Sequence, residues 1–210
     1  MNKMFTAVVG LLLCTGLLHL QADDAKKTEK ADEGSTKILA DFNQPAPNNV
    51  EGNFGAFTPS ETEQVYVCME SIDDVVKHGS SGSSMRLVYN VNKGGAYNGF
   101  WMKLGPADSG NNFDASHYKK LSFWIKGDDK AGLPNKFKVE LKGDPGTPIA
   151  KKYVGELTGD WKKVEVPLED FAAQGVDLTK LNEFCVVFEQ RAVSPATTGA
   201  IYIDDVLLEK

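Results

Sequence analysis

Two adjacent carboxylates near the C-terminus are the side chains of this chain that most suggest chemistry. Asp204 and Asp205 lie in the segment 199–208, where apolar and polar residues alternate in the way that predicts a half-buried strand. Aspartate is a poor strand residue, and a carboxylate beside buried aliphatic side chains is costly unless something neutralises it. The pair therefore predicts a bound cation, a partner charge or a strand end that reaches water.

The elements that must position these acids are short strands. From residue 38 onward, apolar-alternating segments recur between breaks rich in Gly, Pro, Asn and Asp, which are typical of turns. We expect strands at 37–42, 64–70, 84–91, 97–104, 119–126, 136–142, 150–156, 161–166, 183–190 and 199–208. Single helical turns are expected at 168–173 and near 177–180. This pattern predicts an all-β fold, a two-sheet antiparallel β-sandwich in which the acidic first and last strands meet.

The N-terminus predicts export. Residues 1–22 combine one lysine, an apolar run and Ala22 before an acidic stretch, which is the pattern of a cleaved secretory signal peptide. Cys14 raises a lipoprotein as an alternative, although Leu13 stands where such a signal needs a small residue, and an uncleaved membrane anchor is a second alternative. We expect a secreted or periplasmic protein, with a flexible charged linker over 23–36 and one folded domain over 37–210.

The net charge limits the classes of partner, and the number of cysteines limits the possible disulfides. Removing residues 1–22 takes away one lysine and leaves 22 basic against 29 acidic residues, so the net charge becomes −7. This balance, without a basic patch, predicts no nucleic-acid partner, and no membrane insertion is expected after signal cleavage. The two remaining cysteines, Cys68 and Cys185, are open to two interpretations: a disulfide or two buried free thiols.

Several longer segments resemble a known family. The two most specific segments are Phe113–Gly127, with its Ser-His-Tyr-Lys-Lys-Leu-Ser-Phe-Trp-Ile-Lys-Gly, and Gly159–Phe171, with its Asp-Trp-Lys-Lys-Val-Glu-Val-Pro-Leu-Glu-Asp-Phe. Together with the opening ILADFN and the closing YIDDV, they resemble the galactose-binding-like jelly-roll modules. The likeness is greatest to family 11 carbohydrate-binding modules and to the complex-I intermediate-associated proteins. It covers about residues 38–208.

The resemblance implies two sites. Such modules bind glucans on a concave sheet through aromatic and polar side chains, and many hold a structural calcium ion between the first and last strands. Calcium takes six to eight oxygen ligands. The expected ligands here are Asp41, Asn43, Glu51, Asp204 and Asp205. Asp205 is the first choice among the two adjacent acids, because strict alternation turns Asp204 to the other side of the sheet. The alternative is a pair of surface acids at a strand end.

Outward-facing residues of the predicted strands supply the candidates for the sugar site. Pyranose rings stack on aromatic faces, and their hydroxyls need polar partners. The expected ligand-binding residues are Tyr66, Tyr97, Trp101, Lys103, Lys138, Glu140, Tyr153, Glu189 and Arg191. Trp124 and Trp161 are expected to pack in the core instead.

The sequence gives little support for an enzymatic function. After signal cleavage only His78 and His117 remain, without metal-ligand spacing, and no feature singles out two carboxylates for glycoside hydrolysis. The first hypothesis is a non-catalytic module that binds a polysaccharide of the β-glucan type. The second is a module that binds a protein partner in the cell envelope. The third is a jelly-roll glycosidase or lyase.

Overall fold

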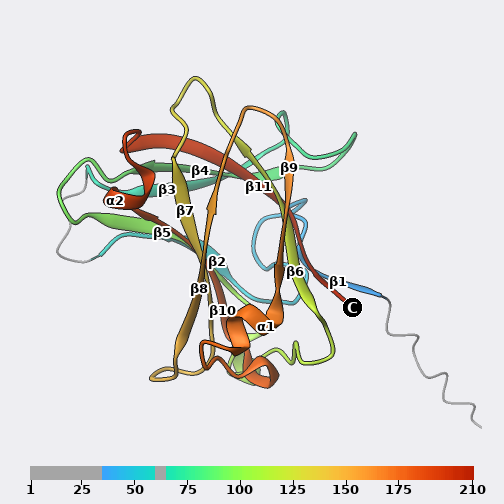
Figure 1. Cartoon of the computed structure of the whole chain (residues 1–210). Coiled ribbons are helices and arrows are strands. Elements are labelled where there is room, and N and C mark those ends of the chain that lie inside the picture. The colour runs from blue at the N-terminus through green and yellow to red at the C-terminus, as the bar shows by residue number, and fades with distance from the viewer. Residues whose placement is uncertain (1–34, 60–64) are drawn as a thin grey trace, which may run out of the picture. The chain divides into compact units, whose positions relative to one another are not determined.

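The computed structural model describes residues 35–59 and 65–210, which form two antiparallel β-sheets (Figure 1). The predicted signal peptide and nearly all of the predicted linker lie outside these residues. Within the described ranges, no helix is long and apolar enough to span a bilayer.

The first sheet, called sheet A here, is built around the last strand. Its strands run in the order β3 (Cys68–Asp73), β4 (Ser84–Asn90), β11 (Thr198–Glu209), β6 (Lys120–Gly127) and β9 (Lys162–Pro167). Strand β1 (Thr36–Ala40) also pairs with β11, along Val206–Glu209, where the pairing with β4 has ended. The first and last strands therefore meet, as the sequence predicts.

The second sheet, sheet B, carries the strands in the middle of the chain. Its order is β2 (Phe54–Phe57), β5 (Tyr97–Lys103), β10 (Glu183–Glu189), β7 (Lys136–Lys142) and β8 (Ile149–Gly155). Two short helices, α1 (Leu168–Ala172) and α2 (Gln190–Val193), lie at opposite ends of this sheet (Figure 1). Two 3-10 turns, η1 (Ala107–Ser109) and η2 (Leu178–Lys180), complete the described elements.

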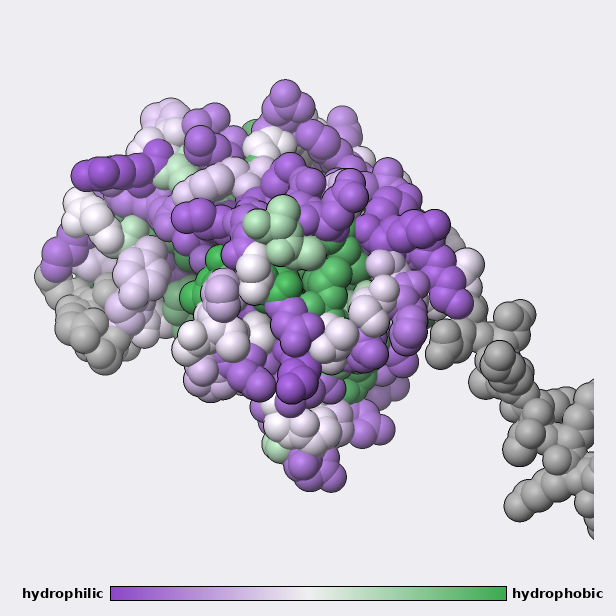
Figure 2. All heavy atoms as spheres, turned by 60° about the horizontal axis from the view of Figure 1, so that its bottom comes forward, coloured by the Kyte–Doolittle hydropathy of each residue, from purple (hydrophilic) through white to green (hydrophobic). Residues whose placement is uncertain are grey.

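The core lies between the two sheets and is rich in aromatic rings. Tyr89 of sheet A stacks on Phe188 of sheet B with ring centres 4.3 Å apart, and Phe123 meets Phe184 edge to face at 5.9 Å. Alternation along each strand turns every second residue into this layer. Each sheet is thus left with an outer face, and polar and charged side chains gather there. In the view of Figure 2, hydrophilic side chains cover most of the surface and surround a smaller hydrophobic area.

The two cysteines are free and buried, so the disulfide alternative is wrong for this structure. Cys68 belongs to the core cluster between the sheets, whereas Cys185 lies on the outer face of sheet B beside Glu183. The two thiols therefore stand on different sides of sheet B and cannot reach each other. Burial raises the pKa of Cys68 to about 12, and burial also raises the pKa of Cys185.

Candidate functional site

The outer face of sheet B collects most of the predicted ligand-binding residues. The strand register places side chains in rows across the sheet. One row contains Trp101, Cys185 and Glu140, and the next contains Val187 and Lys138. The residues from the predicted set on this face are Tyr97, Trp101, Lys103, Lys138, Glu140, Tyr153 and Glu189. Arg191 joins them from α2, at the end of the sheet.

Two aromatic rings lie across glycines on the neighbouring strand. Trp101 of β5 is registered with Gly55 of β2, and Phe57 of β2 is registered with Gly99 of β5. A Cβ atom built on Gly55 would lie 3.3 Å from the Trp101 ring, and one on Gly99 would lie 2.8 Å from the Phe57 ring. Because each glycine leaves room for the ring opposite it, both rings rest against the sheet. This arrangement offers apolar surface at one edge of sheet B.

A hollow of about 280 Å³ lies beside these rings. Its walls are Phe57, Trp101, Lys103, Lys142, Glu183 and Cys185. Apolar surface next to a few fixed polar groups is the usual composition of a small-molecule site.

A continuous chain of ion pairs crosses the middle of this face. We call it the charge ladder, and its members are Lys103, Glu183, Lys142, Glu140, Lys138 and Glu189. Lys138 bridges Glu140 at 2.9 Å and Glu189 at 2.8 Å. Lys142 bridges Glu183 at 2.9 Å and Glu140 at 3.5 Å. At the β5 end, Lys103 contacts the second oxygen of Glu183 at 2.7 Å.

The ladder holds Glu183 and Glu189 ionised although both are partly buried. Burial disfavours the charge of Glu183, but hydrogen bonds from Cys185, Lys103 and Lys142 outweigh it and lower the pKa of Glu183 to about 2. Burial likewise opposes the charge of Glu189, and hydrogen bonds from Lys138 and Tyr153 bring its pKa below the ordinary value. A fixed and ionised set of polar groups can meet sugar hydroxyls without rearranging.

Two of the ladder lysines keep hydrogen-bonding capacity. An ammonium group has three N–H donors. Lys138 and Lys142 each contact two carboxylates, and Lys103 contacts Glu183 and the side-chain oxygen of Asn182. One donor of Lys138 and one of Lys103 therefore remain for a ligand, whereas Lys142 also contacts the Cys185 thiol.

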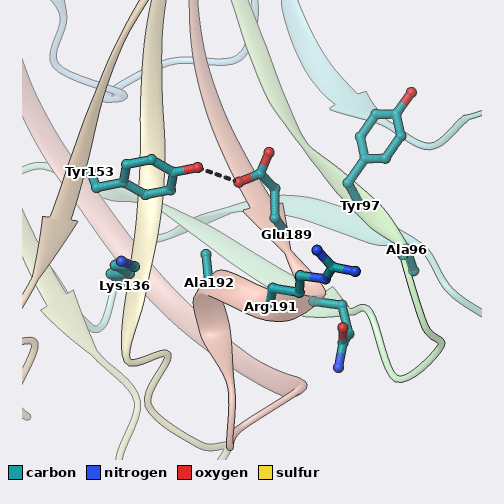
Figure 3. A pocket seen from close by; sticks show the side chains of 9 residues that line it. Ala96, Tyr97, Lys136, Tyr153, Glu189, Arg191 and Ala192 are labelled. Atoms are coloured by element: carbon teal, nitrogen blue, oxygen red, sulfur yellow. Dashed lines mark hydrogen bonds between the residues drawn. The ribbon is translucent and has the colours of Figure 1, made fainter.

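A second hollow, of about 430 Å³, lies at the α2 end of the same face (Figure 3). Tyr97 and Tyr153 stand on either side of Glu189, and the Tyr153 hydroxyl donates to Glu189 at 2.7 Å. Arg191 extends from α2 toward the side that carries Tyr97. The two tyrosines are 48% and 42% exposed, so both offer ring surface to a ligand.

Tyr66 is the one predicted ligand-binding residue that the structure places elsewhere. It precedes β3, and the Lys93 ammonium lies 5.5 Å from its ring centre. It lines neither of the two hollows on sheet B.

The sequence reasoning missed residues on this face that the same alternation could have found. Glu183 continues the outward series of Cys185 and Glu189, and Lys142 continues that of Lys138 and Glu140. Phe57 was not predicted because Phe54-Gly-Ala-Phe57 shows no alternation from which a strand could be recognised.

The predicted calcium ligands are not gathered into one donor set. Asp204 accepts the backbone N–H of His78 at 2.9 Å, and a carboxylate oxygen of Asp205 lies 2.9 Å from the His78 ring nitrogen. Asn43 accepts the backbone N–H of Ser83, and Asp41 accepts that of Asn43. Glu51 is an exposed turn residue. Among the residues that the structure describes, no three His, Cys, Asp or Glu side chains converge as metal ligands. The calcium ion therefore stays a prediction.

A bulge explains why strict alternation misplaces the two acids. The pairing of β11 with β6 shifts register between Asp204 and Leu207, and Asp205 has a positive φ of 47°. An extra residue at a bulge breaks the two-residue period, so both carboxylates reach His78 instead of facing opposite sides. The sequence pattern predicted that Asp204 and Asp205 need a partner, and in the structure this partner is His78.

The prediction that Trp124 and Trp161 pack in the core is wrong. Both are half-buried on the outer side of sheet A, where the His78 ring stacks on Trp124 at 3.8 Å and meets Trp161 edge to face at 5.9 Å. Trp124 is registered with the outward Asp204 rather than with the core residue Ile203. The loop that carries His78 packs on both rings and partly buries them. The apolar sequence around each tryptophan therefore reflects contact with this loop and not with the core.

Known proteins that are similar to this chain share its fold. The family model described as carbohydrate binding domain 30 matches residues 47–210. A comparison with curated proteins finds no match. Among solved structures, a family 11 carbohydrate-binding module from Clostridium thermocellum, in complex with a β-1,3-1,4-mixed-linked tetrasaccharide, is similar with a TM-score of 0.57 and 18% identity. The alignment covers 83% of this chain and 95% of that one.

Two further structures show the same fold. A family 30 carbohydrate-binding module has a TM-score of 0.52 and 19% identity, over 74% of this chain and 77% of that one. An exo-β-agarase has a TM-score of 0.59 and 12% identity, over 82% of this chain and 25% of the agarase. At such identities the structural likeness establishes the jelly-roll β-sandwich, and the family model establishes the family.

Proposed function

Because this chain belongs to the carbohydrate binding domain 30 family, we propose that it binds a β-glucan-like polysaccharide on the outer face of sheet B. The observation that carries the proposal is the combination on one face of flat aromatic rings and fixed polar groups. Trp101 and Phe57 supply apolar surface for pyranose rings, and the charge ladder supplies donors and acceptors for hydroxyls.

The length of the face suits an oligosaccharide. Strand residues rise about 3.4 Å each, so Tyr97 and Trp101 on β5 lie roughly 14 Å apart along the strand. A ligand that contacts both hollows is therefore a chain of several sugars. The tetrasaccharide complex of the similar family 11 module supports a β-linked glucan as the first ligand to try.

In this proposal the protein acts by binding and not by catalysis. In the proposal this outer face is the concave face that receives the polysaccharide, and the predicted signal peptide brings the protein outside the cytoplasm. Hydrogen bonds from the ladder lysines and their neighbours hold the pKa values of Glu183 and Glu189 below the ordinary value, so neither of these two is protonated at neutral pH to serve as a general acid.

Affinity electrophoresis tests the function. The protein is run through gels that contain a mixed-linked β-glucan, a mannan or a galactan, beside Trp101→Ala and the control Trp161→Ala. We expect retardation on the β-glucan, weakened about tenfold or more in Trp101→Ala and unchanged in the control on sheet A. Absence of retardation on every polysaccharide, or equal behaviour of the two variants, would contradict the proposal.

A further inference from the structure

The ligand face of sheet B is positively charged, although the chain as a whole has a net charge of −6. On this face and in the hollow at its α2 end, the described residues include six cations and three carboxylates. The cations are Lys103, Lys136, Lys138, Lys142, Lys151 and Arg191, and the carboxylates are Glu140, Glu183 and Glu189. A cationic surface on an acidic protein indicates a specific electrostatic role for that surface.

The excess charge is concentrated in the second hollow. The three ladder lysines already neutralise the three carboxylates. Within residues 35–59 and 65–210, neither Lys136 nor Arg191 forms an ion pair with a carboxylate, and both line this hollow. The Lys136 ammonium lies 5.0 Å from the ring centre of Tyr153.

The remaining acid of the hollow cannot neutralise these two cations. Glu189 uses one carboxylate oxygen for Lys138 and the other for the Tyr153 hydroxyl. The hollow therefore combines two exposed tyrosine rings with an ammonium and a guanidinium group that have no partner of opposite charge (Figure 3).

We propose that this hollow binds a sugar unit that carries an anionic group, either the carboxylate of a uronic acid or a sulfate ester. This inference rests on the proposed function and specifies its ligand. Arg191 binds the anion on the Tyr97 side of the hollow, Lys136 adds positive charge on the Tyr153 side, and the two tyrosines contact the ring. A guanidinium fork matches the geometry of carboxylate and sulfate oxygens, and hydrogen bonds between charged groups are stronger than neutral ones. The neighbouring sugars of the chain extend over the ladder toward Trp101.

Binding measurements on three matched polymers test the proposal. The ligands are oligomers of β-linked glucuronate, a sulfated β-glucan and the same β-glucan without sulfate, measured by isothermal titration calorimetry. We expect at least one anionic ligand to bind about tenfold or more tightly than the neutral one. The preference should shrink as salt rises from about 0.05 M to about 0.5 M, while neutral binding stays constant. Which of the two anionic ligands is preferred identifies the carboxylate or the sulfate as the anion.

Charge-removing variants locate the preference. Lys136→Gln combined with Arg191→Gln should reduce the anionic preference, measured as the ratio of the affinity for the anionic ligand to that for the neutral glucan, about tenfold. Lys130→Gln, an exposed lysine in the turn after β6, is the control and should change neither affinity.

The outcomes separate the inference from the function on which it rests. Binding of the neutral glucan with no preference for either anion would overturn the inference and leave the proposed function standing. An equal loss in the Lys130→Gln control would show general charge attraction and would also overturn the inference. Failure of all three ligands to bind would contradict the inference and the function together.

Discussion

The buried carboxylate of Asp204 makes stability depend on pH in a direction opposite to that of most acids. Burial, reinforced by the charge of Asp205, raises the pKa of Asp204 from 3.8 to about 6, against the hydrogen bonds from the backbone N–H groups of His78 and Asp205. The folded protein therefore holds the Asp204 proton more tightly than the unfolded chain does. The resulting stability is full below pH of about 4 and is lost as pH rises through about 6.

The magnitude follows from the size of the shift. A difference of about two pKa units corresponds to roughly 3 kcal/mol of unfolding free energy between pH of about 4 and about 7. Asp204→Asn cannot ionise, and its amide oxygen can still accept the His78 N–H. We expect the variant to lack most of this decline. Glu183 and Glu209, whose pKa values are lowered to about 2, affect stability in a lower range, since their contribution is lost only as pH falls from about 4 toward 2.

Urea unfolding at a series of pH values, followed by tryptophan fluorescence, measures the effect. Asp108→Asn, at an exposed position in η1, is the control and should retain the wild-type decline. His78 and Asp205 also face this site and stay in place in Asp204→Asn, so the difference between the two proteins isolates Asp204. An equally steep decline in wild type and Asp204→Asn would refute the reasoning.

Three further predictions follow from the same structure. Ellman's reagent should react with neither Cys68 nor Cys185 in the native protein and with both after denaturation without reductant; two unreactive thiols after denaturation would indicate a disulfide. If a calcium ion lies between the first and last strands, a chelator should lower the melting temperature and added calcium should restore it; an unchanged melting temperature would contradict the calcium prediction. Gly55→Val should push the Trp101 ring off the sheet and weaken glucan binding about tenfold, and affinity electrophoresis that shows wild-type retardation would rule this out.

The sandwich could be predicted because its strands keep strict alternation. Strand β7 occupies Lys136–Lys142, as expected, and the outward orientation of Lys138 and Glu140 followed from the apolar residues between them. The same rule placed Trp101 and Lys103 together on the outer face. The predicted binding face was therefore found from periodicity, without knowledge of the sheet order.

The errors arose where periodicity fails. At Asp205, a bulge brings two successive acids to one partner, and no sequence pattern marked His78 as that partner. Trp124 looked like a core residue because its strand is apolar, but its cover is a loop and not the opposite sheet. The charge ladder could not be predicted either, since it depends on which strands are neighbours in sheet B.

The central claim is that polysaccharide binds the outer face of sheet B. The chain has three tryptophans, of which Trp101 lies on that face and Trp124 and Trp161 lie on sheet A. Their three indole N–H signals in a ¹H–¹⁵N correlation spectrum, once assigned by single substitutions, report on both faces at once. Titration with a mixed-linked β-glucan oligosaccharide should shift the Trp101 signal and leave the other two in place. Shifts of Trp124 and Trp161 with an unmoved Trp101 would contradict the account.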